Sequence, residues 1–180
     1  MIDVPYAKGQ SIVEFVLTLT IMLTLLGGIV DLANLLNAQN SIQNAALQGA
    51  LTGSFSGKNA AADCRILAAI YNGSQGLNGI TINQIIIYQA NLAGNPVGGS
   101  QSIAYEDIYA GNPGCSSASS PPAPVSTNWL PAARNNLMYQ NADLGIKIVY
   151  VYAWQTNLLP FGSVTLSVQA VAPMNPQPAP

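Results

Sequence analysis

The chain has 180 residues, of which five are Lys or Arg, seven are Asp or Glu and none is His. This charged share is far below the quarter that is usual in soluble globular proteins, and it leaves no basic surface for nucleic acid phosphates. Histidine, the commonest general base and transition-metal ligand, is absent from the sequence. We therefore expect no enzyme, no cofactor, no metal site, no nucleic acid partner and no small-molecule substrate.

The N-terminal region contains an apolar run, IVEFVLTLTIMLTLLGGIV, at residues 12–30, in which Glu14 is the only charged residue. As a helix this run would be about 28 Å long at ~1.5 Å per residue, close to the thickness of the hydrocarbon core of a bilayer. The run is therefore long enough to cross a membrane.

The sequence after this run continues a helical pattern without a break. Residues that are apolar, apart from one Gln, recur at steps of three and four, with Asn and Gln on the opposite face. These positions are Leu32, Leu35, Leu36, Gln39, Ile42, Ala46 and Ala50. We predict one continuous helix from Gln10 to Thr52, ended by Gly53 and Ser54. The alternative is a plain signal-anchor followed by an unrelated helix.

Glu14 is an unusual residue for a simple anchor, because a carboxylate in hydrocarbon is costly and needs a partner. It follows the sequence Lys8-Gly9-Gln10. If a peptidase cut after Gly9, the new α-amino group of Gln10 would lie one helical turn from Glu14. That amine would neutralise the carboxylate of the same chain or of a neighbour. Such a pair would also fix the axial register between neighbouring helices.

A short hydrophilic leader, a glycine, and a glutamate five residues later at the head of an apolar helix resemble a type IV prepilin processing site. More narrowly, GQSIVEF, the apolar stretch, the acid Asp31 and the following QNAA helix resemble the TadE-like family of pilin-like proteins. The resemblance implies that Gly9 and Gln10 flank the bond cut by a prepilin peptidase. It also implies that Glu14 is the assembly glutamate and that Asp31 is the acid at the membrane exit.

The rest of the chain predicts a helix and a small sheet. We expect a helix at 60–72 and strands at 80–90, 144–154 and 163–171, because these segments show helical spacing or β-rich alternation. Since nearly every position of 144–154 is apolar, both faces of that strand should be covered. These strands predict an antiparallel sheet of three or four strands with the amphipathic half of the long helix on its apolar face. The fold class is therefore α+β, type IV pilin-like.

The expected organisation has four parts and one irregular loop. The parts are a leader peptide at 1–9, a transmembrane helix at 10–31, an extracytoplasmic pilin-like domain at 32–172 and a Pro-rich tail at 173–180. The loop, at about 91–128, is rich in Gly, Ser and Pro and has one short ordered piece near 103–109. Lys8 is the only base near the start of the helix, so the positive-inside rule places the C-terminus outside.

The two cysteines, Cys64 and Cys115, have no metal-binding spacing. If their segment is extracytoplasmic, a disulfide is the natural state, and two unrelated buried thiols are the alternative. The adjacent acids Glu106 and Asp107 are expected to be solvated loop residues rather than a cation site or an acid–base pair.

The resemblance implies a structural role: a minor pilin or pseudopilin of a tight-adherence type IV pilus. Its partners would be membrane lipid, prepilin peptidase and other pilin subunits through helix–helix packing. It would lie first in the bacterial cytoplasmic membrane and then in a cell-surface pilus that serves adhesion. Main subunits of such pili are usually much shorter, which favours the minor role. Two alternatives stay open: a main repeating pilin, and a signal-anchored surface protein for adhesion or binding.

Overall fold

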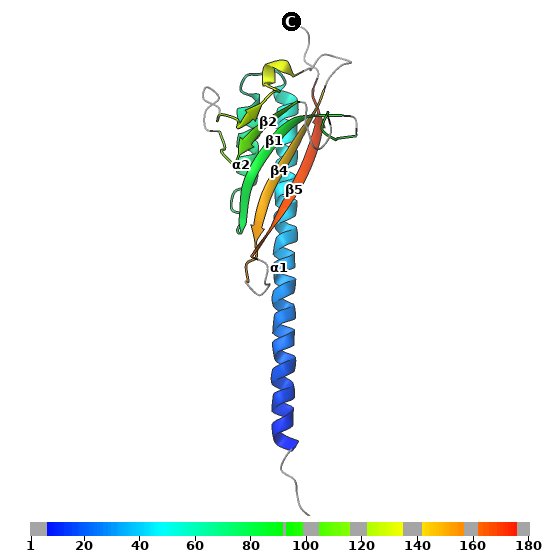
Figure 1. The fold of residues 1–180 in the computed structure, drawn as a ribbon, viewed down its shortest axis with the longest axis vertical. Helices are drawn as coiled ribbons and strands as arrows, with labels where there is room; N and C mark the ends of the chain where they lie inside the picture. Colours follow the sequence, from blue (N-terminus) through cyan, green and yellow to red (C-terminus); the bar gives the residue numbers. More distant parts are fainter. Residues whose placement is uncertain are drawn as a thin grey trace, which may run out of the picture.

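The computed structural model describes residues 7–91, 93–98, 105–115, 122–134, 142–156 and 162–175, with side chains from Ser11 onward. A long helix stands upright, and a sheet and a second helix lie against its upper half (Figure 1). The elements are α1 (Ala7–Ser56), α2 (Ala62–Gly73), β1 (Ile80–Ala90), β2 (Glu106–Ala110), β3 (Ser126–Thr127), the short 3-10 helix η1 (Pro131–Ala133), β4 (Asp143–Ala153) and β5 (Ser163–Pro173). The predicted α+β, pilin-like fold is confirmed.

Helix α1 extends one turn beyond the predicted stop at Gly53 and ends at Ser56. Gly53 keeps a place inside the helix because the domain approaches it closely: a Cβ there would lie 2.7 Å from Ile66. Gly57 ends the helix instead. Its φ of 53° is left-handed, which glycine adopts without strain. Its N–H donates to the carbonyl of Gly53 at 3.1 Å.

The predicted contact face of α1 is wrong in part. Leu32 and Leu36 are 53% and 52% exposed, and Gln39 is exposed as well. The face that meets the domain consists mostly of small residues: Ala38, Ile42, Ala45, Ala46, Gly49, Ala50 and Gly53. The physical reason is proximity, because the backbone of α1 comes so near to α2 and the sheet that large side chains fit only on the outer face.

The sheet has five strands in the order β3-β2-β1-β4-β5, and every neighbouring pair is antiparallel. Strand β1 lies at its centre, with Ile85 opposite Ile148 of β4, and Ile148 lies opposite Val168 of β5. The expectation of three or four strands was too low. The additional strands β2 and β3 come from residues 91–128, where they are too short to show a clear alternation.

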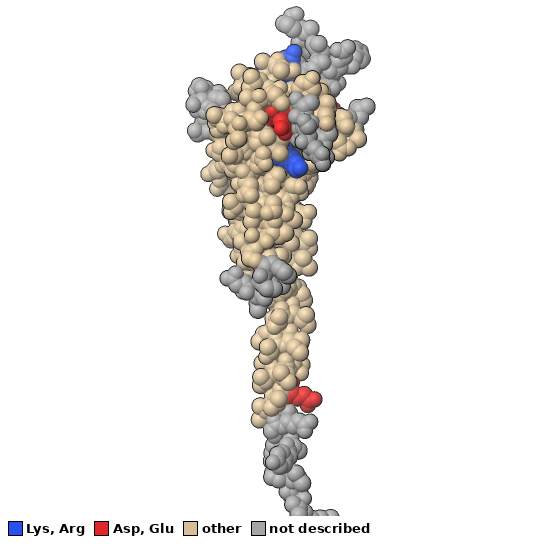
Figure 2. Space-filling model, in the orientation of Figure 1, with Lys and Arg blue, Asp and Glu red and all other residues tan. Residues whose placement is uncertain are grey.

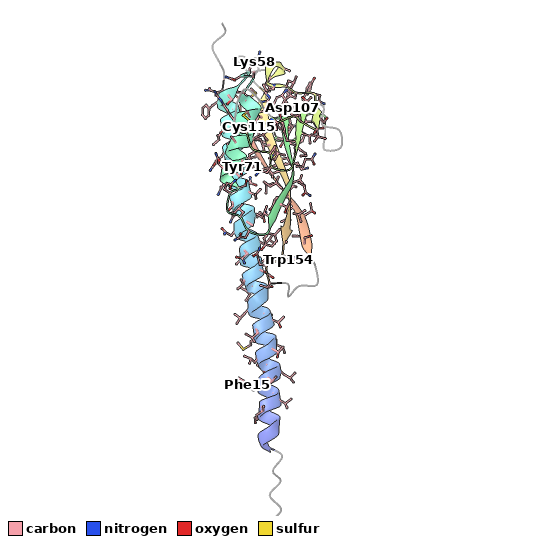
Figure 3. The ribbon with its side chains drawn as sticks, turned by 90° about the vertical axis from the view of Figure 1, so that its left-hand side faces the viewer. Phe15, Lys58, Tyr71, Asp107, Cys115 and Trp154 are labelled. Atoms are coloured by element: carbon pink, nitrogen blue, oxygen red, sulfur yellow. A yellow bond between two sulfur atoms is a disulfide. The ribbon has the colours of Figure 1, made fainter. Side chains whose placement is uncertain are left out.

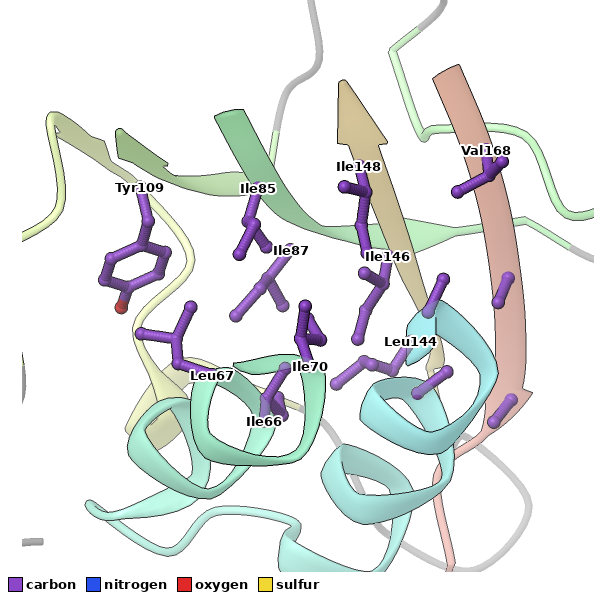
Figure 4. Packing of buried hydrophobic residues seen from close by; sticks show 14 of the residues in the cluster. Ile66, Leu67, Ile70, Ile85, Ile87, Tyr109, Leu144, Ile146, Ile148 and Val168 are labelled. Atoms are coloured by element: carbon purple, nitrogen blue, oxygen red, sulfur yellow. The ribbon is translucent and has the colours of Figure 1, made fainter. Parts of the chain in front are cut away.

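The core lies between the helices and one face of the sheet (Figure 4). Helix α2 directs Ile66, Leu67 and Ile70 toward β1 and β2, and the small residues of α1 cover β4 and β5. On the other face a smaller cluster forms around Tyr88, whose ring fills the space that a side chain at Gly145 would need. The core therefore depends on both helices, and α1 contributes only its upper half.

Candidate functional site

The lower half of α1 is apolar and exposed on all sides. Phe15, labelled in Figure 3, is 65% exposed. The segment Ser11–Ser56 contains a stretch that is long and apolar enough to cross a membrane, with a mean hydropathy of 2.2 and none of that stretch buried. The hydroxyls of Thr18, Thr20 and Thr24 have hydrogen-bond partners within the helix. Each donates a hydrogen bond of 2.8 Å to the backbone carbonyl four residues earlier. Such a helix needs lipid or other helices around it.

Glu14 lies on this exposed part of the helix, and the residues predicted to flank a cleavage site lie just before it. Gly9 and Gln10 have helical backbone within α1, and the side chain of Gln10 lies outside the described part. Helical geometry places Glu14 one turn beyond Gln10. Among the described side chains, none forms an ion pair with Glu14. Its carboxylate therefore faces away from the domain and is accessible to a partner outside this chain.

Asp31 ends the apolar half of α1 and is completely buried. Its carboxylate accepts a hydrogen bond from the backbone N–H of Thr156 at 3.2 Å and a second from the Thr156 hydroxyl. Together with burial, the Asp31 carboxylate raises the pKa of nearby Tyr152. Tyr152 stacks edge-to-face on Trp154, with ring centroids 5.5 Å apart. Asp31 thus joins the helix to the end of strand β4.

A second buried polar cluster, which we did not predict, lies at the far end of the domain. The fully buried guanidinium of Arg134 pairs with Asp63 of α2 and, at 3.3 Å, with Asp107 of β2. The Tyr109 hydroxyl donates to Asp63 at 3.0 Å. The Arg134 guanidinium also lies 4.9 Å from the ring centre of Trp129. Asp107 is fully buried, so its interpretation as a solvated loop acid was wrong.

Burial dominates the electrostatics of this cluster. It raises the pKa of Asp63, although the positive charge of Arg134 opposes the shift. Burial and the neighbouring Asp63 carboxylate raise the pKa of the Tyr109 hydroxyl as well. Because two acids share one arginine in a dry environment, removing that arginine would leave buried charge without compensation. The arrangement fastens α2, β2 and the segment after η1 together.

A disulfide between Cys64 and Cys115 lies near this cluster, with the two Cα atoms 5.2 Å apart. It connects α2 to the segment that follows β2, so the predicted pairing is present in the structure. Among the described residues, no group of three or more Cys, Asp or Glu side chains is arranged to hold a metal ion.

These features define a class of protein: a membrane-type apolar helix that continues into a small α+β domain, as in a pilin-like subunit. The sequence model of the TadE-like protein family matches residues 9–51. The resemblance found in the N-terminal sequence is thereby confirmed over this segment, which contains Gly9, Gln10, Glu14 and Asp31. No curated protein and no solved structure matches the chain. The N-terminal segment, which includes most of α1, is therefore similar to TadE-like proteins.

Proposed function

We propose that this chain is a structural subunit of a tight-adherence pilus, most closely a minor pilin or pseudopilin. The observation that carries the proposal is Glu14, an exposed carboxylate on an otherwise apolar helix that pairs with no described side chain of its own subunit. A charge in that position is costly in lipid unless a neighbouring chain supplies a partner. The match to the TadE-like family over residues 9–51 supports the same conclusion.

Maturation supplies that partner. A prepilin peptidase cuts between Gly9 and Gln10, and the α-amino group of Gln10 is then the positive charge nearest to Glu14. By analogy with the family, this amine is methylated. In the assembled structure the amine of one subunit pairs with Glu14 of its neighbour, because any other axial offset leaves a charge unpaired in an apolar environment.

The domain lies on the extracytoplasmic side of the bacterial membrane. Lys8 before the apolar run favours an inside N-terminus. The Cys64–Cys115 disulfide supports the outside location of the domain, since such bonds persist in oxidising compartments. From the membrane the subunit enters a cell-surface pilus, with α1 toward the filament axis and the sheet outward.

Substitution of Glu14 tests the assembly role. We expect Glu14→Ala and Glu14→Gln to insert into the membrane as wild type does and to be absent from pili sheared from cells. Thr24→Ala is the matched control, because the Thr24 hydroxyl donates to the Thr20 carbonyl of its own helix. Normal pilus incorporation of Glu14→Ala would contradict the proposal and favour a permanently anchored surface protein.

The abundance of the chain in purified pili separates a minor from a main subunit. A minor pilin is present at a few copies or at one end of the filament, as gold-labelled antibodies would show. Labelling along the whole filament would contradict the minor role and leave the pilin assignment in place.

A further inference from the structure

An open pocket lies where the domain meets the helix, between α1, the turn before β1 and the end of β4. Four carboxamide side chains line it, from Asn34, Asn37, Asn78 and Gln155. We propose that this pocket binds the phosphoethanolamine headgroup of a phospholipid in the membrane leaflet next to the domain. The inference rests on the proposed membrane-inserted state of the subunit and adds a specific lipid contact to it.

The pocket lies at the depth of the lipid headgroups. Asp31 is the first polar residue after the apolar run, so it marks the edge of the hydrocarbon core. At ~1.5 Å per residue, Asn34 and Asn37 lie about 4 and 9 Å further along α1. The headgroup layer of one leaflet extends about 5 to 8 Å beyond the hydrocarbon. The two asparagines therefore lie in or next to that layer.

The wall opposite α1 is held in place by contacts of its own. Thr156 is bound to Asp31, and the adjacent Gln155 packs so closely on Gly79 that a Cβ there would lie 2.3 Å from the Gln155 amide nitrogen. The Ala153 N–H donates to the Gly79 carbonyl at 2.7 Å. Trp154, which lies beside the helix in Figure 3, is half-buried in the same segment. Tryptophan is enriched at this depth of a membrane.

The chemistry of the lining fits a zwitterionic headgroup. The four carboxamide residues that line the pocket are all exposed, so their polar groups are accessible to a ligand. Carboxamide N–H groups donate to phosphate oxygens, and carboxamide oxygens accept from an ammonium. An ethanolamine headgroup offers both, whereas a choline headgroup has no N–H to donate.

Charge argues against an anionic lipid as the occupant. No Lys or Arg is among the residues that line the pocket. In Figure 2 the basic side chains visible on the domain lie in its upper part, far from the lower helix. The volume of about 270 Å³ is below the ~300–1,000 Å³ of pockets that enclose whole small ligands, so it suits a headgroup.

Lipid retention by the full-length protein tests the inference. The protein is reconstituted in vesicles with equal amounts of phosphatidylethanolamine, phosphatidylcholine and phosphatidylglycerol with identical acyl chains. Gentle extraction and native mass spectrometry then identify the lipid that stays bound. We expect enrichment of phosphatidylethanolamine. An Asn34→Ala/Asn37→Ala variant should retain about tenfold less phosphatidylethanolamine than wild type, as expected for the loss of two hydrogen bonds.

The matched control is Asn40→Ala/Asn44→Ala, which removes two exposed asparagines of the same helix further from the membrane. It should retain phosphatidylethanolamine as wild type does. Equal retention of the three lipids, or unchanged retention by Asn34→Ala/Asn37→Ala, would overturn the inference. Flotation with the vesicles separates the two levels: protein that floats without selectivity refutes only the pocket, and protein that does not float refutes the membrane-inserted state as well.

Discussion

Asp31 and Thr156, 125 residues apart in the sequence, are joined by two hydrogen bonds at the point where α1 leaves its apolar half. Thr156 follows β4, so this contact fixes the lower end of the sheet to the helix. The carboxylate is completely buried and accepts from both the backbone and the hydroxyl of one residue. Asp31 therefore has a structural task, which is to set the position of the domain relative to the apolar half of the helix.

Replacing Asp31 should loosen this junction. We expect Asp31→Ala to cost about 1–3 kcal/mol, because the Thr156 N–H and hydroxyl lose their buried acceptor. Asp31→Asn keeps one acceptor oxygen and should cost less. The measurement is amide hydrogen exchange of the full chain in nanodiscs, with Leu32→Ala as the control, since Leu32 is largely exposed. Unchanged protection of the Thr156 amide in Asp31→Ala would contradict this assignment.

The buried arginine should be among the most sensitive positions of the domain. Arg134→Ala leaves Asp63 and Asp107 buried without their cation, at an expected cost of about 3–5 kcal/mol. The control is Arg65→Ala, which removes an exposed arginine from α2. Chemical unfolding of both variants measures the difference. Equal stability of the two would show that the Arg134 cluster does not hold the domain together.

The pH dependence of stability should carry the signature of Asp63. Burial raises its pKa in the folded state above the ordinary 3.8, so the folded chain binds more protons than the unfolded chain between these two values. The contribution of Asp63 is then complete below about pH 4 and is lost as the pH rises through the raised pKa. In wild type the free energy of unfolding, measured between pH 4 and 7, should therefore contain a contribution that decreases as the pH rises. Asp63→Asn should abolish this decrease, whereas Asp143→Asn, with the same charge change, should keep it. An identical slope in wild type and Asp63→Asn would refute the assignment.

Close packing of α1 gives a further prediction. A Cβ at Gly49 would lie 2.8 Å from Ile70 and 2.9 Å from Ile146, so Gly49→Val should destabilise the domain by about 1–3 kcal/mol. Gly28→Val makes the same exchange where nothing lies within 4 Å, and it should cost nothing. Thermal unfolding of the two variants measures the contrast. If Gly28→Val lowered the stability as much as Gly49→Val, the loss would come from the helix propensity of valine and not from contact with Ile70 and Ile146.

Much of the fold was predictable, because its longest elements have strong local signals. Strand β1 occupies the predicted residues 80–90, and β5 begins at the predicted Ser163 because its alternation is strict. The contact face of α1 was harder to predict. Large apolar residues usually mark the buried face of a helix, yet Leu32 and Leu36 are exposed and alanines and glycines meet the sheet. Hydrophobicity does not report how closely two backbones approach.

The Arg134 cluster could not be predicted for a different reason. Its members come from α2, β2 and the segment after η1, which converge only in the folded chain. Adjacent acids in a Gly- and Ser-rich region resemble solvated loop residues. The buried Asp107 is instead compensated by Arg134 and by hydrogen bonds from the Thr127 hydroxyl and the Trp129 N–H, all from later in the chain. The sole available signal was composition, since charged residues in a chain with so few of them have a high chance of specific partners. Glu14, in contrast, could be singled out from the sequence, because a single carboxylate in an apolar helix requires a partner.

The N-terminal residue of the mature protein tests the central claim most directly. Protein purified from the cell envelope, digested and analysed by mass spectrometry should begin at Gln10, with a methylated α-amino group, one helical turn from Glu14. A Gly9→Val variant should remain uncut and fail to enter pili, whereas Gly28→Val should be processed as wild type is. Envelope protein that still carries residues 1–9 would contradict the account, because Glu14 would then have no amine to pair with.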